Sequence, residues 1–296
     1  MSIRLFENIE QISSEDVTLA LQTAVAQARR NLPVFTYRCQ NHSSANNFYP
    51  DCDNNQWTCG FWPGQIWLAY EYTYDTVFRD SGDILVKDFL NRIISKIEVD
   101  HHDMGFLYTP SCVSAYMLTG NEEARTAALL AADQLMSRFQ QTGEFLQAWG
   151  AMNADENYRY IIDCLLNLPL LYWAERETGD EKYADIAMRH TRTCLKYSIR
   201  SDGSTFHTVF MNKTTGEFER GETCQGYSHD SSWARGQAWA IYGTALSYAN
   251  SGMKHHYEAF ANVLAFYLSR LPADMVPCWD LIFSDGDGEP RDSSSA

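Results

Sequence analysis

The sequence has no excess of basic residues, no long apolar run and no closely spaced cysteine pair. Its 23 Lys and Arg against 38 Asp and Glu give a net charge of −15, which argues against a nucleic-acid partner because phosphate binding requires a basic surface. No stretch approaches the ~18 apolar residues of a membrane helix. The N-terminal MSIRLFEN lacks a basic segment followed by an apolar one, so we expect no signal peptide, no membrane association and a soluble, cytoplasmic protein.

The cysteines are scattered and form no Cys-x-x-Cys pair, which argues against a structural zinc site and against a disulfide framework. We expect reduced thiols, several of them in apolar helical runs. The eight positions are Cys39, Cys52, Cys59, Cys112, Cys164, Cys194, Cys224 and Cys278.

Strand signals are sparse, whereas helical periodicity recurs along the chain. Residues 19–30 read as an amphipathic helix, and an aromatic-rich apolar helix followed by a Thr/Gly/Asn/Asp turn and a more polar helix then repeats. Apolar first helices and polar second helices predict an inner and an outer ring. We therefore predict an all-α (α/α) toroid forming one catalytic domain over 1–296; an α-solenoid would show a more regular period. The four copies begin near Gly64, Val113, Leu165 and Gly236.

Long loops between the hairpins carry most of the unusual chemistry. Trp, His, Asp and Arg concentrate there, where a helical scaffold has no packing reason to place them. In a ring these loops gather at one mouth, which predicts a site at that end. The loops span 54–61, 100–107, 147–159, 201–210 and 221–235.

The first candidate is the run Asp100-His101-His102-Asp103. Adjacent residues point in different directions, so the four are not expected to bind one metal ion together, and the His-Glu-x-x-His spacing of a metalloprotease is absent. We expect no metal and no other cofactor. One member of the run directed into a pocket is the more plausible reading.

Asp163 stands in the apolar run RYIIDCLLNLPLLYW, where a lone carboxylate is costly to bury or else binds a proton. It could simply cap a helix, but Pro169 favours a helix start near 166–168 with Asn167 as the cap. Asp163 would then lie just ahead of that helix with no capping duty.

Two further positions suggest binding of an anion. Arg235 stands between Trp233 and Trp239 and would suit a carboxylate, while core packing could explain the tryptophans. His207 could be a simple polar contact. Because the chain is acidic overall, an anionic substrate would need a local cationic patch, for which Arg235, His102 and His207 are the candidates.

Several stretches, in order along nearly the whole chain, resemble the unsaturated glucuronyl hydrolases of glycoside hydrolase family 88. Each motif alone is weak, but the set is specific. The stretches are WTCGFWPG (57–64), DHHDMGF (100–106), LQAWG (146–150), IIDCLLNLP (161–169), FHT (206–208) and SWARGQAW (232–239).

The resemblance implies an (α/α)6 barrel without a metal and an oligosaccharide substrate that carries a 4,5-unsaturated uronic acid at its non-reducing end. In such a reaction the enol ether is protonated at C4, water adds at C5 and the resulting hemiketal opens to release the sugar chain. By motif matching Asp163 resembles the acid–base residue and Asp103 its assisting carboxylate. The residues that resemble the substrate pocket are Trp57, His102, Trp149, His207, Gln225, Trp233, Arg235 and Trp239.

Family members usually extend further, so we expect the last hairpins of the ring to be missing. An open ring would expose apolar inner faces. Two alternatives to the main interpretation remain: a related hydrolase of unsaturated rhamnogalacturonan fragments, which the His-His-Asp run disfavours, and a catalytically silent sugar-binding toroid. The sequence leaves the parent polysaccharide and the oligomeric state undecided.

Overall fold

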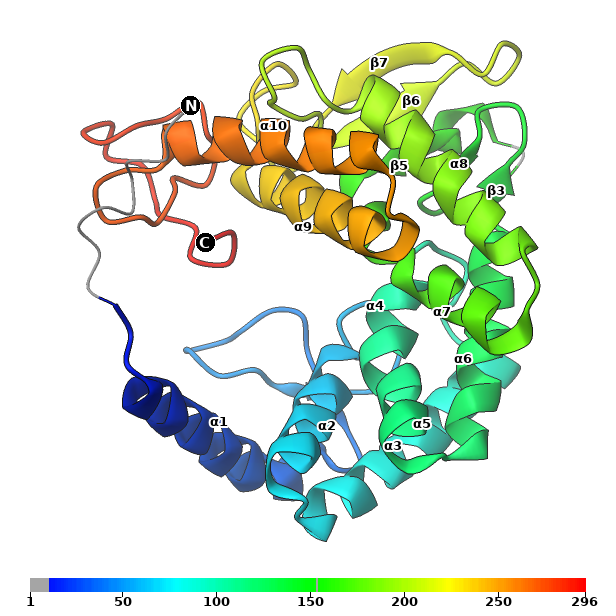
Figure 1. Cartoon of the computed structure of the whole chain (residues 1–296), viewed down its shortest axis with the longest axis vertical. Helices are drawn as coiled ribbons and strands as arrows, with labels where there is room; N and C mark the ends of the chain where they lie inside the picture. The colour runs from blue at the N-terminus through cyan, green and yellow to red at the C-terminus, as the bar shows by residue number, and fades with distance from the viewer. Residues whose placement is uncertain (1–10, 153) are drawn as a thin grey trace.

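The computed structural model describes residues 11–152 and 154–296, and its helices follow one another around a ring (Figure 1). Helix α1 (Ser14–Phe35) begins at Ser13, whose side chain accepts from the Asp16 N–H in a capping box. Four helical hairpins follow, each close to a predicted repeat. They are α2 (Phe61–Thr73) with α3 (Thr76–Ile94), α5 (Ser114–Thr119) with α6 (Glu122–Met136), α7 (Pro169–Thr178) with α8 (Lys182–Tyr197), and α9 (Ala234–Ser251) with α10 (Lys254–Arg270).

The hairpin turns have the backbone geometry that their composition predicts. Gly120, Gly179 and Gly252 end α5, α7 and α9 with φ between 67° and 73°, a left-handed conformation that glycine adopts without steric cost. Asn121 then caps α6, because its side chain accepts from the N–H groups of Glu123 and Ala124. The predicted helical hairpins are thus confirmed.

The first helix of each hairpin lies toward the middle of the ring and the second lies outside it, as predicted (Figure 1). One apolar core joins residues from Cys39 to Val263. Besides Leu135, α6 contributes small residues that allow close packing, namely Ala124, Ala127, Ala128, Ala131 and Ala132.

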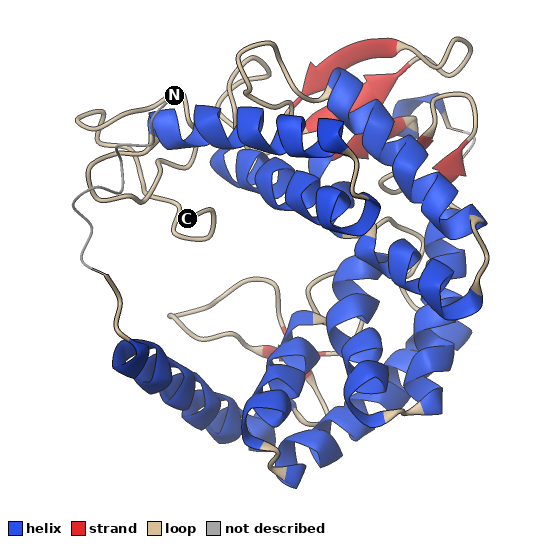
Figure 2. Cartoon of the chain, in the orientation of Figure 1, coloured by secondary structure: helices blue, strands red, loops and turns tan. Residues whose placement is uncertain are grey.

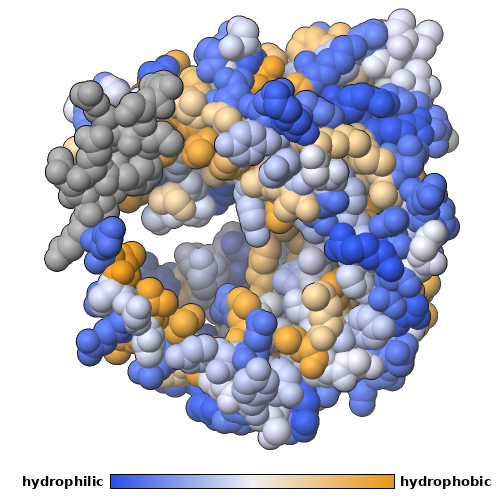
Figure 3. Space-filling model, viewed as in Figure 1, coloured by the Kyte–Doolittle hydropathy of each residue, from blue (hydrophilic) through white to orange (hydrophobic). Residues whose placement is uncertain are grey.

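The ring is open between α1 and the segments near the C-terminus (Figures 1 and 3). Several apolar side chains of the inner helices lack cover: Leu68 and Tyr72 of α2 are 66% and 44% exposed, and Tyr242 of α9 is 61% exposed. On α1, Val17 and Leu21 are also exposed. Figure 3 shows apolar residues gathered over α1 and α2 beside the opening.

Short strands occur in the connecting segments, which the all-helical prediction did not include (Figure 2). Strands β1 (Cys39–Gln40) and β2 (Asp51–Cys52) pair, as do β3 (Phe139–Gln140) and β4 (Phe145–Leu146). A three-stranded antiparallel sheet consists of β5 (Arg159–Ile161), β6 (Thr208–Met211) and β7 (Phe218–Glu222). This sheet joins three of the loops that were predicted to meet at the site, 147–159, 201–210 and 221–235.

No helix within 11–152 or 154–296 combines the length and apolarity needed to cross a membrane. The expectation of no signal peptide concerns residues outside the described part of the chain. The eight cysteines form no disulfide in this structure, and their reduced state stays a prediction.

Candidate active site

The segment that precedes α4 (Met104–Tyr108) is fixed by backbone contacts. The buried Arg92 guanidinium donates to the carbonyl oxygens of Ile97 and Glu98 at 3.1 and 2.8 Å. Further along, the His102 N–H donates to Ala148 O at 2.8 Å. Hydrogen bonds thus connect this segment both to α3 and to the loop that follows β4. They fix the position of its side chains.

Asp163 arrives from the other side, in a 3-10 turn, η4 (Ile162–Leu166), directly after β5. The Ile162 N–H donates to His207 O at 3.0 Å, which extends the link between β5 and the β6 segment. As predicted, Asp163 does not cap the following helix, because α7 begins at Pro169 with Leu168 in the capping position. The expectation that Asn167 caps α7 is wrong.

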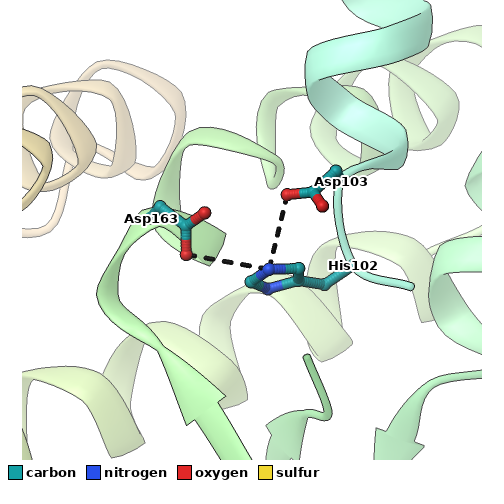
Figure 4. Close-up of side chains that lie close together, drawn as sticks. All are labelled: His102, Asp103 and Asp163. Carbon is teal, nitrogen blue, oxygen red and sulfur yellow. Dashed lines mark ion pairs between the residues drawn. The ribbon is translucent and has the colours of Figure 1, made fainter. Parts of the chain in front are cut away.

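Asp103, Asp163 and His102 meet at one point (Figure 4). The His102 Nε2 lies 3.4 Å from an Asp103 carboxylate oxygen and 3.7 Å from Asp163 Oδ1. One functional atom from each of the three residues lies within 4.8 Å of the other two. The two aspartates that motif matching singled out, 60 positions apart in the chain, are therefore neighbours in space.

The surroundings of the two carboxyl groups separate their proton affinities. Burial raises the pKa of Asp163 well above its ordinary value, and the negative charge of Asp103 raises it further. Burial also acts upward on Asp103, but the contacts with His102 and His101 outweigh it and leave the pKa of Asp103 lowered. The pair thus holds one proton on Asp163 next to an ionised Asp103, an arrangement suited to a general acid.

Asp163 Oδ1 is buried and has no hydrogen-bond partner within the described residues. An unpaired polar atom in such a place is costly. Protonation lowers that cost, because a neutral carboxyl group is easier to bury than a carboxylate. The local geometry therefore agrees with the direction of the pKa shift.

The expectation that His102 and His207 contribute to a cationic patch is wrong. Burial lowers the pKa of each to about 4, and for His207 the positive charge of Arg235 acts in the same direction. Both imidazoles are therefore neutral at neutral pH. They can donate or accept a hydrogen bond, but they supply no charge to an anion.

A cavity of about 470 Å³ contains this cluster, within the usual size range of small-molecule sites. Both aspartates and six of the eight predicted binding residues line it: Trp57, His102, Trp149, His207, Gln225 and Trp239.

The other two predicted binding residues do not line the cavity. Trp233 is 4% exposed and packs behind it, with its ring centre 4.7 Å from that of His207 and 5.2 Å from that of Trp239. The Arg235 guanidinium lies 4.7 Å from the Trp233 ring centre and donates to Ser294 Oγ at 2.9 Å. Trp233 thus supports two lining rings, and Arg235 contacts Trp233 without lining the cavity.

Seven lining residues were not predicted individually. Asn55, Gln56, His101 and Cys224 belong to loops that the sequence marked as unusual, so their position could have been inferred. His42 and Glu98 belong to none of those loops, and the sequence gives no signal for them; Ile161 begins the motif 161–169, of which only Asp163 was assigned to the site. The full set is His42, Asn55, Gln56, Glu98, His101, Ile161 and Cys224.

The spacing of His102, Asp103 and Asp163 would also suit a metal ion. The argument that adjacent residues point apart holds for Asp100, which pairs with Arg138 at 2.7 Å, but not for His102 and Asp103, which both face Asp163. Coordination would require Asp163 to be ionised, against the direction of its pKa shift. The expectation of no metal stays a prediction.

The chain matches the family model described as Glycosyl Hydrolase Family 88 over residues 34–296. The chain belongs to this family. Within family 88 it is 45% identical over 290 residues to an unsaturated chondroitin disaccharide hydrolase of Streptococcus pneumoniae, covering 98% of this chain and 73% of the relative.

Solved family 88 structures agree with the fold predicted from the sequence. A crystal structure of an unsaturated glucuronyl hydrolase from Streptococcus agalactiae superposes with a TM-score of 0.95 at 46% identity, covering 98% of this chain and 73% of that one. The crystal structure of a variant of the S. agalactiae enzyme, complexed with dGlcA-GalNAc6S, superposes with a TM-score of 0.86 at 41% identity. This match covers 100% of this chain and 74% of the variant's chain. The predicted toroid is thus confirmed.

Proposed function

We propose that this protein hydrolyses oligosaccharides that carry a 4,5-unsaturated uronic acid at the non-reducing end, with Asp163 as acid and base. The observation that carries the proposal is the buried carboxyl pair, in which Asp163 keeps its proton beside an ionised Asp103. The names of the family 88 relatives, an unsaturated chondroitin disaccharide hydrolase and an unsaturated glucuronyl hydrolase, support the same substrate class.

The geometry suits hydration of an enol ether. Asp163 gives its proton to C4, the double bond supplies the electron pair for the new C–H bond, and positive charge develops at C5 beside the ring oxygen. Water adds at C5 and returns a proton to the Asp163 carboxylate. The C5 hemiketal opens, and the hemiacetal left at C1 releases the remaining sugar. One carboxyl group thus serves both proton transfers.

The closeness of the two carboxyl groups is central to this route. One oxygen of Asp103 and one of Asp163 lie within 4.8 Å of each other. Two carboxyls this close raise the proton affinity of one member. In the proposed mechanism Asp103 keeps Asp163 protonated and helps to orient the water.

Substrate binding is proposed to use aromatic faces and neutral hydrogen-bonding groups. Trp57 and Trp149 line the cavity and are 38% and 42% exposed, so each can stack on a sugar ring. No Lys or Arg occurs among the described residues that line the cavity. Arg235 remains our candidate for the charge that favours the uronate, because its positive charge already acts on His207 at the cavity wall.

The test is the loss of ultraviolet absorbance when the protein is mixed with an unsaturated chondroitin disaccharide. We expect the absorbance of the conjugated double bond to disappear as the second sugar is released. A disaccharide that lacks the double bond is the matched control and should stay intact. In D2O the product should carry deuterium at C4, because that carbon takes its proton from the acid. Cleavage of the saturated control, or a product without deuterium at C4, would refute the mechanism.

We also propose that residues 1–296 act as one catalytic domain in the cytoplasm. The main apolar core, which joins residues from Cys39 to Val263, supports the first statement. Eight free cysteines support the second, since thiols persist in reducing compartments. Cell fractionation with an antibody against the chain would test the location.

A further inference from the structure

Asp103 occupies a position where an aspartate normally caps a helix, yet its carboxylate forms no capping bond. It precedes α4 as the N-cap residue and has no side-chain bond to the first turn. Aspartate is among the preferred N-cap residues because its side chain accepts from the N–H two or three residues ahead. Here that third N–H, of Phe106, donates instead to Asn167 Oδ1 at 2.7 Å.

Asn167 reaches α4 from the segment that carries the other carboxyl group. It lies four residues after Asp163, and its Nδ2 donates to Asp163 O at 3.5 Å. Its side chain is fully buried and does not line the cavity. One amide group thus connects the backbone beside Asp103 with the backbone of Asp163.

Close packing around Gly105 holds the same two segments together. A Cβ atom added to Gly105 would lie 2.3 Å from Asn167 Cα and 2.5 Å from Asn167 O, which no side chain could tolerate without backbone movement. The two segments therefore meet backbone to backbone, and the Asn167 amide group forms a hydrogen bond with each of them.

We propose that Asn167 is a positioning residue of the active site: it caps α4 in place of Asp103 and so leaves the Asp103 carboxylate free to face Asp163. The catalytic consequence rests on the proposed function. The structural statement does not, because it concerns which side chain accepts from the Phe106 N–H.

Removal of the amide predicts a specific rearrangement. In Asn167→Ala the Phe106 N–H would lose its acceptor inside the protein, which is costly, and the Asp103 carboxylate is the group placed to replace it. Asp103 would then turn away from Asp163 and no longer raise its proton affinity. Asp163 would ionise at lower pH, and the alkaline limb of the kcat profile would move toward acid.

Several other titratable groups act on the pair. Their charges and proton affinities set the background against which this shift is read, and none of them forms a hydrogen bond with the Asn167 side chain within the described residues. They are His101, His102 and Arg92, which lower the pKa of Asp103, and Cys164 and Cys194, whose pKa values are raised by the charge of Asp163.

The experiment compares Asn167→Ala with Asn121→Ala. Asn121 is a matched control because it caps α6 through the same kind of bonds, to Glu123 and Ala124, and is not among the cavity-lining residues. We expect Asn167→Ala to lower kcat at least ~10-fold with KM changed less than ~3-fold, and to move the alkaline limb of the profile to lower pH. Asn121→Ala should lower the melting temperature but leave kcat and the profile unchanged.

Asn167→Asp provides a second variant if the alanine variant does not fold. It keeps an oxygen that can accept from the Phe106 N–H, so Asp103 stays in place and the alkaline limb should not move toward acid. An acidward shift in this variant would overturn the inference. So would an Asn167→Ala enzyme with the wild-type kcat and profile, or an Asn121→Ala enzyme with an equal loss of kcat.

A readout without substrate separates this inference from the proposed function. Carbon NMR of labelled aspartate carboxyl groups, with Asp163 assigned through Asp163→Asn, reports the pKa of Asp163 in each variant. A lower Asp163 pKa in Asn167→Ala supports the inference even if the wild-type protein turns over no unsaturated disaccharide, an outcome that would refute the proposed function alone. An unchanged pKa in the folded variant overturns the inference.

Discussion

Replacing Asp163 with Asn should remove activity. It should also make the protein increasingly stable relative to wild type as pH rises. The amide has the same shape as the carboxyl group but cannot exchange a proton, so we expect turnover to fall ~10²–10⁴-fold or more. The stability effect follows from the raised pKa of Asp163, which burial and the neighbouring Asp103 cause. It tests the proton affinity independently of catalysis.

The sign of the stability effect follows from linkage. The unfolded chain ionises Asp163 near pH 3.9, whereas the folded protein retains the proton to higher pH. The stabilising contribution of the folded-state proton is complete below the unfolded pKa and is lost as pH rises through the folded pKa. Each unit of difference amounts to about 1.4 kcal/mol. Asp163→Asn has no such loss.

The assay is thermal unfolding of wild type and variant from pH 4 to pH 8. The melting temperature of Asp163→Asn relative to wild type should increase across this range, by roughly 2–4 °C for each kcal/mol in chains slightly shorter than this one. Asp230→Asn, at an exposed position, is the control and should show no such trend. A constant difference between pH 4 and pH 8 would refute the raised pKa, and more than about a tenth of wild-type activity would remove Asp163 from the mechanism.

Three further outcomes can be measured with the same protein. Asp103→Asn should lose most activity and shift the alkaline limb of the kcat profile to lower pH, because the charge that raises the Asp163 pKa is gone. Full activity of this variant would exclude Asp103 from the mechanism. A strong chelator should change neither activity nor melting temperature, and rescue by a divalent cation would contradict this. Arg235→Ala should raise KM more than it lowers kcat; an unchanged KM would place the uronate elsewhere.

The arrangement of helices could be predicted from the sequence because its determinants are local. Apolar residues at helical spacing and glycines such as Gly120 and Gly179 at the turns mark each hairpin within a few residues. Strands such as Cys39–Gln40 and Asp51–Cys52 have two residues each. Alternation of apolar and polar residues cannot be detected over two positions, so these strands were missed.

The site was predicted only as far as single motifs allow. Asp103 and Asp163 could be named from their motifs, but the cap formed by Asn167 joins residues 61 positions apart. The local sequence around Asn167 is typical of a residue that caps the next helix. Tertiary packing instead places its side chain where it caps α4. The charge of His207 was predicted wrongly for a similar reason, because burial is a property of the fold.

The uncovered apolar side chains beside the opening of the ring have a consequence for the behaviour of the protein in solution. Exposed apolar side chains can form hydrophobic contacts between molecules, as in the case of Leu68, Tyr242, Val17 and Leu21. A net charge of −15 makes the molecules repel one another. Salt weakens only the second effect, since the screening length falls from about 10 Å at 0.1 M to about 3 Å at 1 M. Concentrated salt should therefore favour self-association of this protein, and dilute buffer of neutral pH should keep it dispersed.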